Sequence, residues 1–404
     1  MTLQETPSAN RLHIAIYGRR NAGKSSLINA LTRQQAALVS EIAGTTTDPV
    51  KKAMEVRGLG ACVLIDTAGF DDEGELGTLR IKKTRETIAR AEIAILVLTP
   101  EAKDLSAEIQ WNQELKAAGI RRVAVINKAD MGIDSAYAAL AAKELGVCPI
   151  PVSAKTGEGM EKLLEALVRQ IPENYGERTI AGNLVKPGDV VMLVMPQDSE
   201  APKGRLILPQ VQTIREMLDR RCISINVTPD TMEAALASLK KAPDLIITDS
   251  QVFGEVYQKL PKESRLTSFS VLFAAYKGDI QAFAKGAEAI DTLNADSKIL
   301  IAEACTHAPL SEDIGKVKIP AMLRRKFGET LQIDMVSGAD FPKNLEPYSL
   351  IIHCGGCMFN RKYLLSRVEQ AKNAGVPITN YGILIAKLKG ILDKVEIPQD
   401  TTSF

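Results

Sequence analysis

The chain has 404 residues, and its 50 lysines and arginines nearly balance its 49 aspartates and glutamates, so no basic excess would draw it onto nucleic acid or an anionic membrane. No apolar run approaches the ~18 residues that a membrane helix needs, and the N-terminal segment lacks the apolar core of a signal peptide. Six cysteines are too few for a disulfide scaffold. Taken together, these features predict a soluble, cytoplasmic protein without nucleic-acid or membrane partners, and its length predicts roughly two or three domains.

The first part of the chain alternates short apolar runs with longer amphipathic stretches. The apolar runs are HIAIYG, CVLID, AILVL, RRVAVINK and VCPIPVSA, and SSLINALTR has a helical pattern. Such alternation predicts a parallel sheet with crossover helices. Residues 171–189 are rich in glycine and proline and show little periodicity, which indicates a linker and a first domain over residues 1–175.

The first apolar run leads into a phosphate-binding motif. Gly18-Arg-Arg-Asn-Ala-Gly-Lys-Ser25 matches G-x-x-x-x-G-K-[ST] between a predicted strand and a predicted helix. In such a P-loop the backbone N–H groups wrap the phosphates, Lys24 neutralises phosphate oxygens and Ser25 ligates Mg²⁺. Asp66-Thr-Ala-Gly69 ends another apolar run, where Asp66 can hold Mg²⁺ through water and the Gly69 amide can reach the γ-phosphate.

Two further motifs would recognise the base. Asn127-Lys-Ala-Asp130 ends an apolar run, and the Asp130 carboxylate can accept two guanine N–H groups in a pattern that adenine does not offer. Ser153-Ala-Lys155 lies where a backbone amide would contact guanine O6. The order of the motifs predicts a GTP-binding, GTP-hydrolysing domain whose nucleotide residues are Gly18, Asn21, Ala22, Gly23, Lys24, Ser25, Ser26, Thr46, Asp66, Gly69, Asn127, Lys128, Asp130, Ser153, Ala154 and Lys155.

These motifs resemble those of the TrmE/Era-like GTPases, whose first switch reads G-T-T-R-D where this chain has GTTTD at residues 44–48. The resemblance implies that Thr46 ligates Mg²⁺, with the neighbouring threonines as alternatives. Phe70 stands where Ras-like enzymes have a water-orienting glutamine, so slow intrinsic hydrolysis is expected. In members that bind K⁺, an asparagine stands at the position of Asn21, which implies K⁺-stimulated hydrolysis with Lys24, Asn21, Thr46 and Gly69 as the catalytic set.

Two smaller α/β domains with mainly parallel sheets are predicted to follow the P-loop domain. In residues 178–264, the expected strands are DVVMLVMP, CISINVT and DLIITDS, and the expected helices are PQVQTIREMLDR and TMEAALASLKK. In residues 265–404, the expected strands are SFSVLFAAY, KILIAEACTH, TLQIDMVSG, YSLIIHCGG and VPITNYG. Ligands of open parallel sheets lie outside the carboxyl ends of the strands, which draws attention to CTH and HCGGC.

Cysteine and histidine gather in these two short pieces. Cys305 and His307 are two residues apart, so in an extended segment they can face one centre. His353 precedes a C-x-x-C turn that brings Cys354 and Cys357 around one ion or cluster. A Cys₃His zinc site and an iron–sulfur cluster held by three cysteines both fit this spacing, and a reactive thiol without a metal is a third interpretation.

The pattern C-x-H followed by H-C-x-x-C, joined to an N-terminal GTPase, resembles the [FeFe]-hydrogenase maturation GTPases, the HydF family, over essentially the whole chain. The resemblance implies a [4Fe–4S] cluster in residues 265–404 and homodimerisation through residues 178–264. Cluster thiolates would come from Cys305, Cys354 and Cys357, and the fourth ligand or a group beside it from His307, His353 or Glu303.

The same resemblance implies the function of a GTPase and scaffold. Such a protein holds the precursor of the hydrogenase diiron subcluster and delivers it to the [FeFe]-hydrogenase apoprotein, in company with radical-SAM maturases. The alternative is a ribosome- or tRNA-associated GTPase with a structural zinc site. Against that alternative stand the balanced charge and the lack of a recognisable basic or aromatic RNA-binding stretch in the last two domains.

Overall fold

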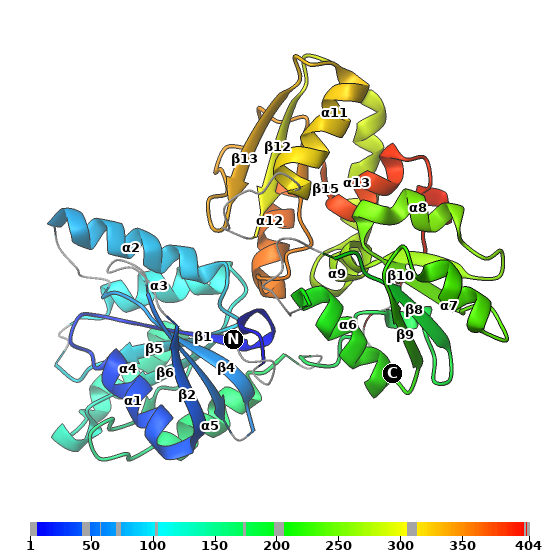
Figure 1. The fold of residues 1–404 in the computed structure, drawn as a ribbon. Helices are drawn as coiled ribbons and strands as arrows, with labels where there is room; N and C mark the ends of the chain where they lie inside the picture. The colour runs from blue at the N-terminus through cyan, green and yellow to red at the C-terminus, as the bar shows by residue number, and fades with distance from the viewer. Residues whose placement is uncertain are drawn as a thin grey trace. The chain divides into compact units, whose positions relative to one another are not determined.

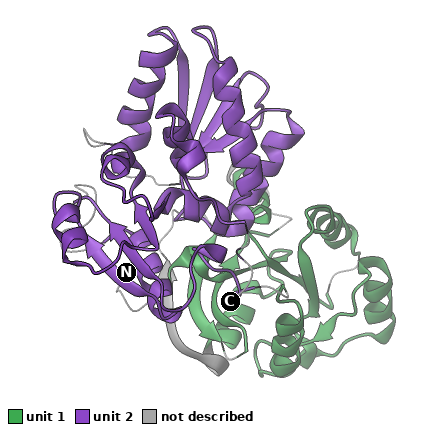
Figure 2. Cartoon of the chain, turned by 90° about the vertical axis from the view of Figure 1, so that its right-hand side faces the viewer, with its two compact units in different colours: residues 1–173 green, residues 174–404 purple. Residues whose placement is uncertain are grey.

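The structure is a computed structural model that describes residues 6–42, 49–56, 58–69, 74–101, 104–172, 175–197, 206–304, 313–399 and 401, without the side chains of residues 33–42 and 74–76. The predictions for the first switch (residues 44–48, with Thr46), Phe70, Cys305 and His307 lie outside the described residues. The chain forms two compact units, residues 1–173 and residues 174–404 (Figure 2).

The first unit is built on a seven-stranded sheet with the order β2-β3-β4-β1-β5-β6-β7 (Figure 1). Its parallel part comprises β1 (Leu12–Gly18), β4 (Gly60–Asp66), β5 (Ile93–Leu98), β6 (Arg121–Ile126) and β7 (Ile150–Pro151). At one edge, β3 (Val50–Val56) runs antiparallel to β4, and β2 (Ala36–Ile42) runs antiparallel to β3. The connecting helices are α1 (Lys24–Gln35), α2 (Gly74–Ile88), α3 (Ser106–Ala117), α4 (Ser135–Leu145) and α5 (Met160–Arg169).

Strand register in this sheet brings the nucleotide motifs together. The core strands β1 and β5 are buried over their whole length. In the parallel pair β1 and β4, Ile16 lies opposite Asp66, so the P-loop after β1 and the Asp66 motif after β4 emerge side by side. The antiparallel strands β2 and β3 were not predicted, because they carry charged residues at an edge of the sheet rather than a continuous apolar run.

The second unit contains two four-stranded sheets in which all strands are parallel. The first has the order β11-β10-β8-β9, from β8 (Val190–Val194), β9 (Ile223–Val227), β10 (Leu245–Thr248) and β11 (Arg265–Ser268). The second has the order β13-β12-β14-β15, from β12 (Lys298–Glu303), β13 (Gln332–Ser337), β14 (Leu350–His353) and β15 (Ile378–Asn380). The predicted α/β class, a P-loop domain followed by two domains with parallel sheets, is confirmed.

Helices α6 (Leu208–Asp219), α7 (Met232–Ser238), α8 (Phe253–Gln258), α9 (Phe269–Lys277) and α10 (Ile280–Gly286) connect the strands of the first sheet and lead into the second. The second sheet is flanked by α11 (Ile319–Phe327), α12 (Arg361–Asn373) and α13 (Tyr381–Leu388). One hydrophobic core contains buried residues from both sheets, among them Met192 and Ile246 from the first and Leu300 and Ile351 from the second. The two sheets therefore share much of their packing.

One predicted strand of the third domain is wrong. SFSVLFAAY was expected to be a strand, but Phe269–Lys277 forms the helix α9, whose N-terminus is capped by the Ser268 side chain accepting from the Val271 amide. Seven residues of this helix, Lys277 among them, are buried, so its apolar residues show no helical periodicity that would distinguish it from a buried strand. The predicted boundary after residue 264 falls just before β11, which pairs with β10 of the first sheet.

Within the part of the chain that the structure describes, no helix has the length and apolar character needed to cross a membrane.

Candidate functional site

The P-loop joins β1 to α1 in the conformation that its glycines and Asn21 permit. Asn21 and Gly23 have φ angles of 61° and 86°, in the left-handed region. Lys24 is 8% exposed, and its Nζ donates to the main-chain oxygens of Gly18 (3.0 Å) and Arg19 (2.9 Å). The ammonium group is thus held over the loop that would surround the phosphates.

Asn127 connects three of the predicted motifs. Its Nδ2 donates to the oxygen of Ala22 in the P-loop (2.9 Å), and its Oδ1 accepts from the Ala154 amide (3.1 Å). A Cβ atom added at Gly23 would lie 2.2 Å from the Asn127 Nδ2 atom, so this position requires glycine. Asn127, buried at 2% exposure, therefore joins the phosphate side of the site to the base side.

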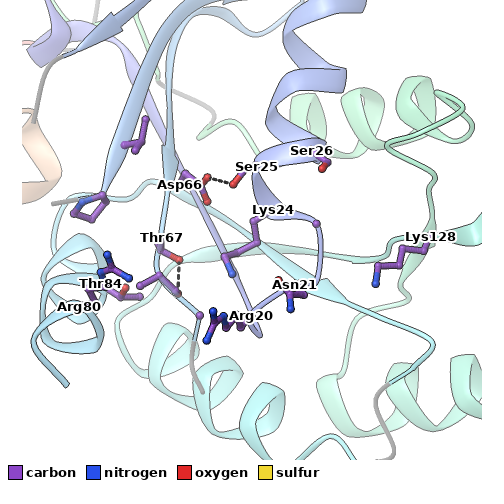
Figure 3. A pocket seen from close by; sticks show the side chains of 15 residues that line it. Arg20, Asn21, Lys24, Ser25, Ser26, Asp66, Thr67, Arg80, Thr84 and Lys128 are labelled. Atoms are coloured by element: carbon purple, nitrogen blue, oxygen red, sulfur yellow. Dashed lines mark hydrogen bonds between the residues drawn. The ribbon is translucent and has the colours of Figure 1, made fainter. Parts of the chain in front are cut away.

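The predicted Mg²⁺ ligands Ser25 and Asp66 lie in contact. The Ser25 hydroxyl donates to Asp66 Oδ2 at 2.5 Å (Figure 3). Burial raises the pKa of Asp66, while the hydrogen bond from Ser25 and the charge of Lys24 act in the opposite direction. A hydroxyl and a carboxylate are hard oxygen donors of the kind that Mg²⁺ takes from proteins, so the residues present fit this ion.

The base-recognition motifs also meet in space. The Ser153 hydroxyl, fully buried, donates to Asp130 Oδ1 at 2.6 Å, and this hydrogen bond lowers the pKa of Asp130. A carboxylate that stays ionised can accept the two guanine N–H groups. Beside it, a pocket of about 520 Å³ is lined by residues of α1 and of the loop before α5: Ser26, Asn29, Ala30, Ala154, Lys155, Thr156 and Gly157.

A second pocket, of about 600 Å³, lies at the P-loop (Figure 3). It is lined by predicted residues from both phosphate motifs, namely Asn21, Gly23, Lys24, Ser25, Ser26, Asp66 and Gly69, together with Lys128. Arg20, Arg80 and Thr84 also line it, although sequence reasoning did not name them. Arg20 lies inside the recognised motif, and the other two lie on α2, directly after the second motif, where no fixed spacing marks them.

Cys354 lies at the carboxyl end of β14, next to the end of β12. Ala302 of β12 is paired with His353 of β14, and the Cys354 amide donates to the Ala302 oxygen at 3.0 Å. The sulfur of Cys354 accepts from the amides of Ala304 (3.0 Å) and Gly356 (3.4 Å). Backbone N–H groups aimed at cysteine sulfur are one of the means by which proteins tune iron–sulfur clusters.

Glu303, the last residue of β12, is a buried carboxylate at the same edge of the sheet as Cys354. It is 5% exposed, and its Oε1 accepts from the hydroxyl of Tyr381 at 3.1 Å. Lys316 Nζ lies 3.7 Å from its Oε2. A Cβ added at Gly315 would lie 2.1 Å from Glu303 Oε1, so glycine there lets the backbone approach the carboxylate.

His353 is fully buried with both ring nitrogens bonded to protein groups. Nδ1 lies 2.8 Å from the Cys354 oxygen, and Nε2 lies 3.0 Å from Nη1 of Arg367. Burial, reinforced by the Arg367 charge, lowers the pKa of His353 to about 3, so the ring is neutral, Nδ1–H donates and Nε2 accepts. Arg367 itself is 1% exposed and lies over the rings of Phe341, Phe359 and Tyr363 at 4.6–4.8 Å.

The described cysteines are all free thiols. Cys62, Cys148 and Cys222 form no disulfide bond, and neither do Cys354 and Cys357. Among the described residues, which exclude Cys305 and His307, no group of three or more metal-ligating side chains converges. The described thiols of Cys354 and Cys357 are donors of the kind that an iron–sulfur cluster uses, so they fit such a group.

Comparison with known proteins supports the nucleotide site. Residues 13–128 match the family model described as a 50S ribosome-binding GTPase. The tRNA modification GTPase MnmE of Lactobacillus delbrueckii subsp. bulgaricus is 36% identical over 184 residues, which cover 44% of this chain and 39% of the relative. The MnmE of Paraburkholderia xenovorans is 38% identical over 160 residues, which cover 39% of this chain and 34% of the relative.

Among solved structures, the G domain of the T. maritima FeoB iron transporter is 26% identical, with 40% of this chain and 98% of that chain covered and a TM-score of 0.31. The chain spans less than two fifths of the length of the two MnmE relatives. Its first unit, with the P-loop, the base-recognition motifs and the sheet that positions them, defines a P-loop GTPase.

The rest of the chain identifies the family. Residues 180–278 match the dimerization domain of hydrogen maturase F, and residues 281–397 match its tetramerization domain. Together these two matches cover more than half of the chain, which therefore belongs to the hydrogen maturase F family. Membership implies a role in hydrogenase maturation, and the two domains imply self-association.

Proposed function

We propose that this protein is a GTP-hydrolysing scaffold for assembly of the diiron subcluster of [FeFe]-hydrogenase. It binds a [4Fe–4S] cluster in its last domain, holds the subcluster precursor there as cargo, and delivers it to the apo-hydrogenase. Radical-SAM maturases supply the precursor, and the protein acts as a homodimer. The observation that carries the proposal is that one chain contains both a GTPase site and, at the end of β14, the Cys354 sulfur, which accepts hydrogen bonds from two backbone N–H groups.

Cys305, Cys354 and Cys357 are proposed as the cluster thiolates. Glu303 and His307 are the candidates for the fourth ligand, because the described ring nitrogens of His353 already contact Cys354 and Arg367. His353 then supports the loop without ligating iron. A cluster bound there would supply an iron corner able to bridge to an incoming metal fragment.

The nucleotide site would hydrolyse GTP by in-line attack of water on the γ-phosphorus. The bond to the β–γ bridging oxygen breaks, its electron pair passes to the β-phosphate, and GDP and phosphate leave. Lys24 and the P-loop amides neutralise the developing charge. Ser25, Asp66 and Thr46 are proposed to hold Mg²⁺, which would supply positive charge against the phosphates, and Asn21 is proposed to hold K⁺.

Anaerobic reconstitution of the full chain with iron and sulfide tests the scaffold proposal. We expect about four iron atoms per chain, as a [4Fe–4S] cluster requires, and a paramagnetic signal after reduction. Stoichiometric, tightly bound zinc with no cluster would instead support the alternative of a ribosome- or tRNA-associated GTPase. The tRNA modification relatives match 44% and 39% of this chain, whereas residues 180–278 and 281–397 of the second unit match hydrogen maturase F domains, so no observation on the second unit favours that alternative.

K⁺ dependence gives a separate prediction. Replacing KCl with NaCl at equal ionic strength is expected to slow GTP turnover by about tenfold, because a cation beside the phosphates offsets transition-state charge. The matched variant is Asn21→Gly, which keeps the left-handed conformation at φ 61° but removes the amide oxygen. Its turnover in KCl should fall to the NaCl value, and equal wild-type rates in the two salts would refute the K⁺ site.

The recognition of the guanine base gives another testable prediction. Asp130→Asn is expected to weaken GTP binding by about a hundredfold or more, because an amide presents a donor where guanine also presents one. Xanthosine triphosphate, which has an acceptor at that position, should bind more tightly to the variant than GTP does. Displacement of a fluorescent nucleotide measures both affinities, and unchanged GTP binding would contradict the assigned role of Asp130.

A further inference from the structure

α9 ends in a lysine whose side chain points into the protein. Lys277 is 2% exposed, and its Nζ donates to the main-chain oxygens of Cys357 (3.1 Å) and Phe359 (2.9 Å). Among the described residues no carboxylate pairs with this ammonium group, and its two hydrogen bonds go to main-chain oxygens on either side of Met358, in the segment that carries Cys357. A buried ammonium group is costly unless hydrogen bonds and a nearby negative charge compensate for lost hydration.

Residues 354–361, the cysteine loop, contact the end of α9 in return. Arg361, the first residue of α12, donates from Nη1 to the oxygens of Tyr276 (3.2 Å) and Gly278 (2.7 Å). These carbonyls lie at the C-terminal end of α9, where a helix leaves acceptors without intrahelical partners and favours a cation. The end of α9 and residues 354–361 are therefore fixed to each other by two cationic side chains, one from each segment.

The two cysteines of the loop pack against different hydrophobic clusters. Cys354 packs against the core shared by both sheets, whereas Cys357 packs against a separate cluster of the first sheet that includes Phe269 and Phe273 of α9. Between them, a Cβ added at Gly355 would lie 3.9 Å from the Cβ of Phe273. The Cys357 half of the loop is thus held by α9.

We propose that Lys277 is a positioning residue of the metal centre: it anchors the Cys357 half of the loop and places a positive charge beside the bound cluster. The inference rests on the proposed function. Residues 180–278, the match to the dimerization domain, include α9, so that domain contributes directly to the metal centre. A fixed positive charge favours the reduced cluster, which carries one more electron, and an anchored loop retains iron longer.

The test uses the reconstituted full chain and two substitutions. Lys277→Met removes the charge and the donors while keeping a chain of similar length, and Lys277→Arg keeps the charge. In a titration with dithionite read by paramagnetic resonance, Lys277→Met is expected to lower the reduced-to-oxidised ratio at a fixed potential about tenfold, which equals about 59 mV for one electron. Its iron should also pass faster to a chelator. Lys326→Met, which removes an exposed lysine of the same unit, should match the wild type in both.

A Lys277→Met protein with the wild-type potential and the wild-type rate of iron loss overturns the proposal. If that variant does not fold, Lys277→Arg carries the test, with a wild-type potential and faster iron loss expected. A Lys277→Arg protein with a shifted reduction potential and the wild-type rate of iron loss would overturn the proposal.

Hydrogen exchange of the amides of residues 354–361 in the metal-free full chain tests the anchoring without any cluster. Loss of two charge-assisted hydrogen bonds should speed exchange there by about tenfold or more in Lys277→Met, and unchanged exchange overturns the positioning role. If the wild-type chain takes up no cluster, the proposed function fails, while this measurement still decides whether Lys277 holds the loop.

Discussion

Replacing Lys24 with alanine is expected to slow GTP hydrolysis by about a hundredfold or more, a loss of about 2.7 kcal/mol of transition-state stabilisation. The Lys24 ammonium group is buried at 8% exposure and already held by the oxygens of Gly18 and Arg19. It therefore meets the phosphates with little reorganisation, and its charge acts where water is largely excluded. Phosphate release under single-turnover conditions measures the effect.

The matched control for this prediction is Lys143→Ala, which removes an exposed lysine on α4 of the same unit. It should hydrolyse GTP at close to the wild-type rate and unfold at the wild-type temperature. If Lys24→Ala keeps the wild-type turnover while remaining folded, the catalytic assignment of the P-loop is wrong. A folded variant with weakened nucleotide binding and slow turnover agrees with it.

Cys354→Ser is expected to abolish the cluster, with bound iron after anaerobic reconstitution falling to the background level. The sulfur lies between the amides of Ala304 and Gly356, and a serine hydroxyl offers iron a harder and poorer ligand than a thiolate. Burial raises the pKa of the Cys354 thiol to about 12, so the metal must supply the free energy that deprotonates this group. Iron analysis and the paramagnetic signal of the reduced protein measure the loss.

Cys148→Ser is the control for that experiment, because Cys148 is an exposed cysteine of the first unit. Its iron content should equal that of the wild type. Thermal unfolding of the metal-free Cys354→Ser chain separates loss of a ligand from loss of the fold. A folded Cys354→Ser protein with full iron content would remove Cys354 from the metal centre.

Features that depend on residues close together in the sequence were predictable. The P-loop, the Asp66 motif and the base motifs each follow an apolar run, and the structure places each beside the end of a strand. The strands of the two later sheets were predicted for the same reason, since their apolar runs are short and bounded by turn residues, with the exception of β11, whose residues Arg265–Ser268 were not expected to form a strand. The helix α9 was not predicted, because burial on nearly every side hides the period of a helix.

Contacts between distant residues were beyond the reach of sequence reasoning. Asn127 was expected at the base, but its side chain joins Ala22 to Ala154, residues that lie far apart in the chain. Lys277 and Arg367 look like ordinary charged residues of helices in the sequence, yet both are buried around the cysteine loop. Their burial depends on tertiary packing that no local pattern encodes.

The hydrophobic core that contains residues of both sheets in the second unit has a consequence for thermal denaturation. Its two sheets are expected to melt together in one cooperative transition, since neither can lose its packing without exposing apolar side chains of the other. A chain cut after residue 278 would leave the inner face of α9 bare and should aggregate. Residues 180–278 and 281–397, which match the dimerization and tetramerization domains, are therefore expected to fold as one unit, and neither should be stable as an isolated fragment.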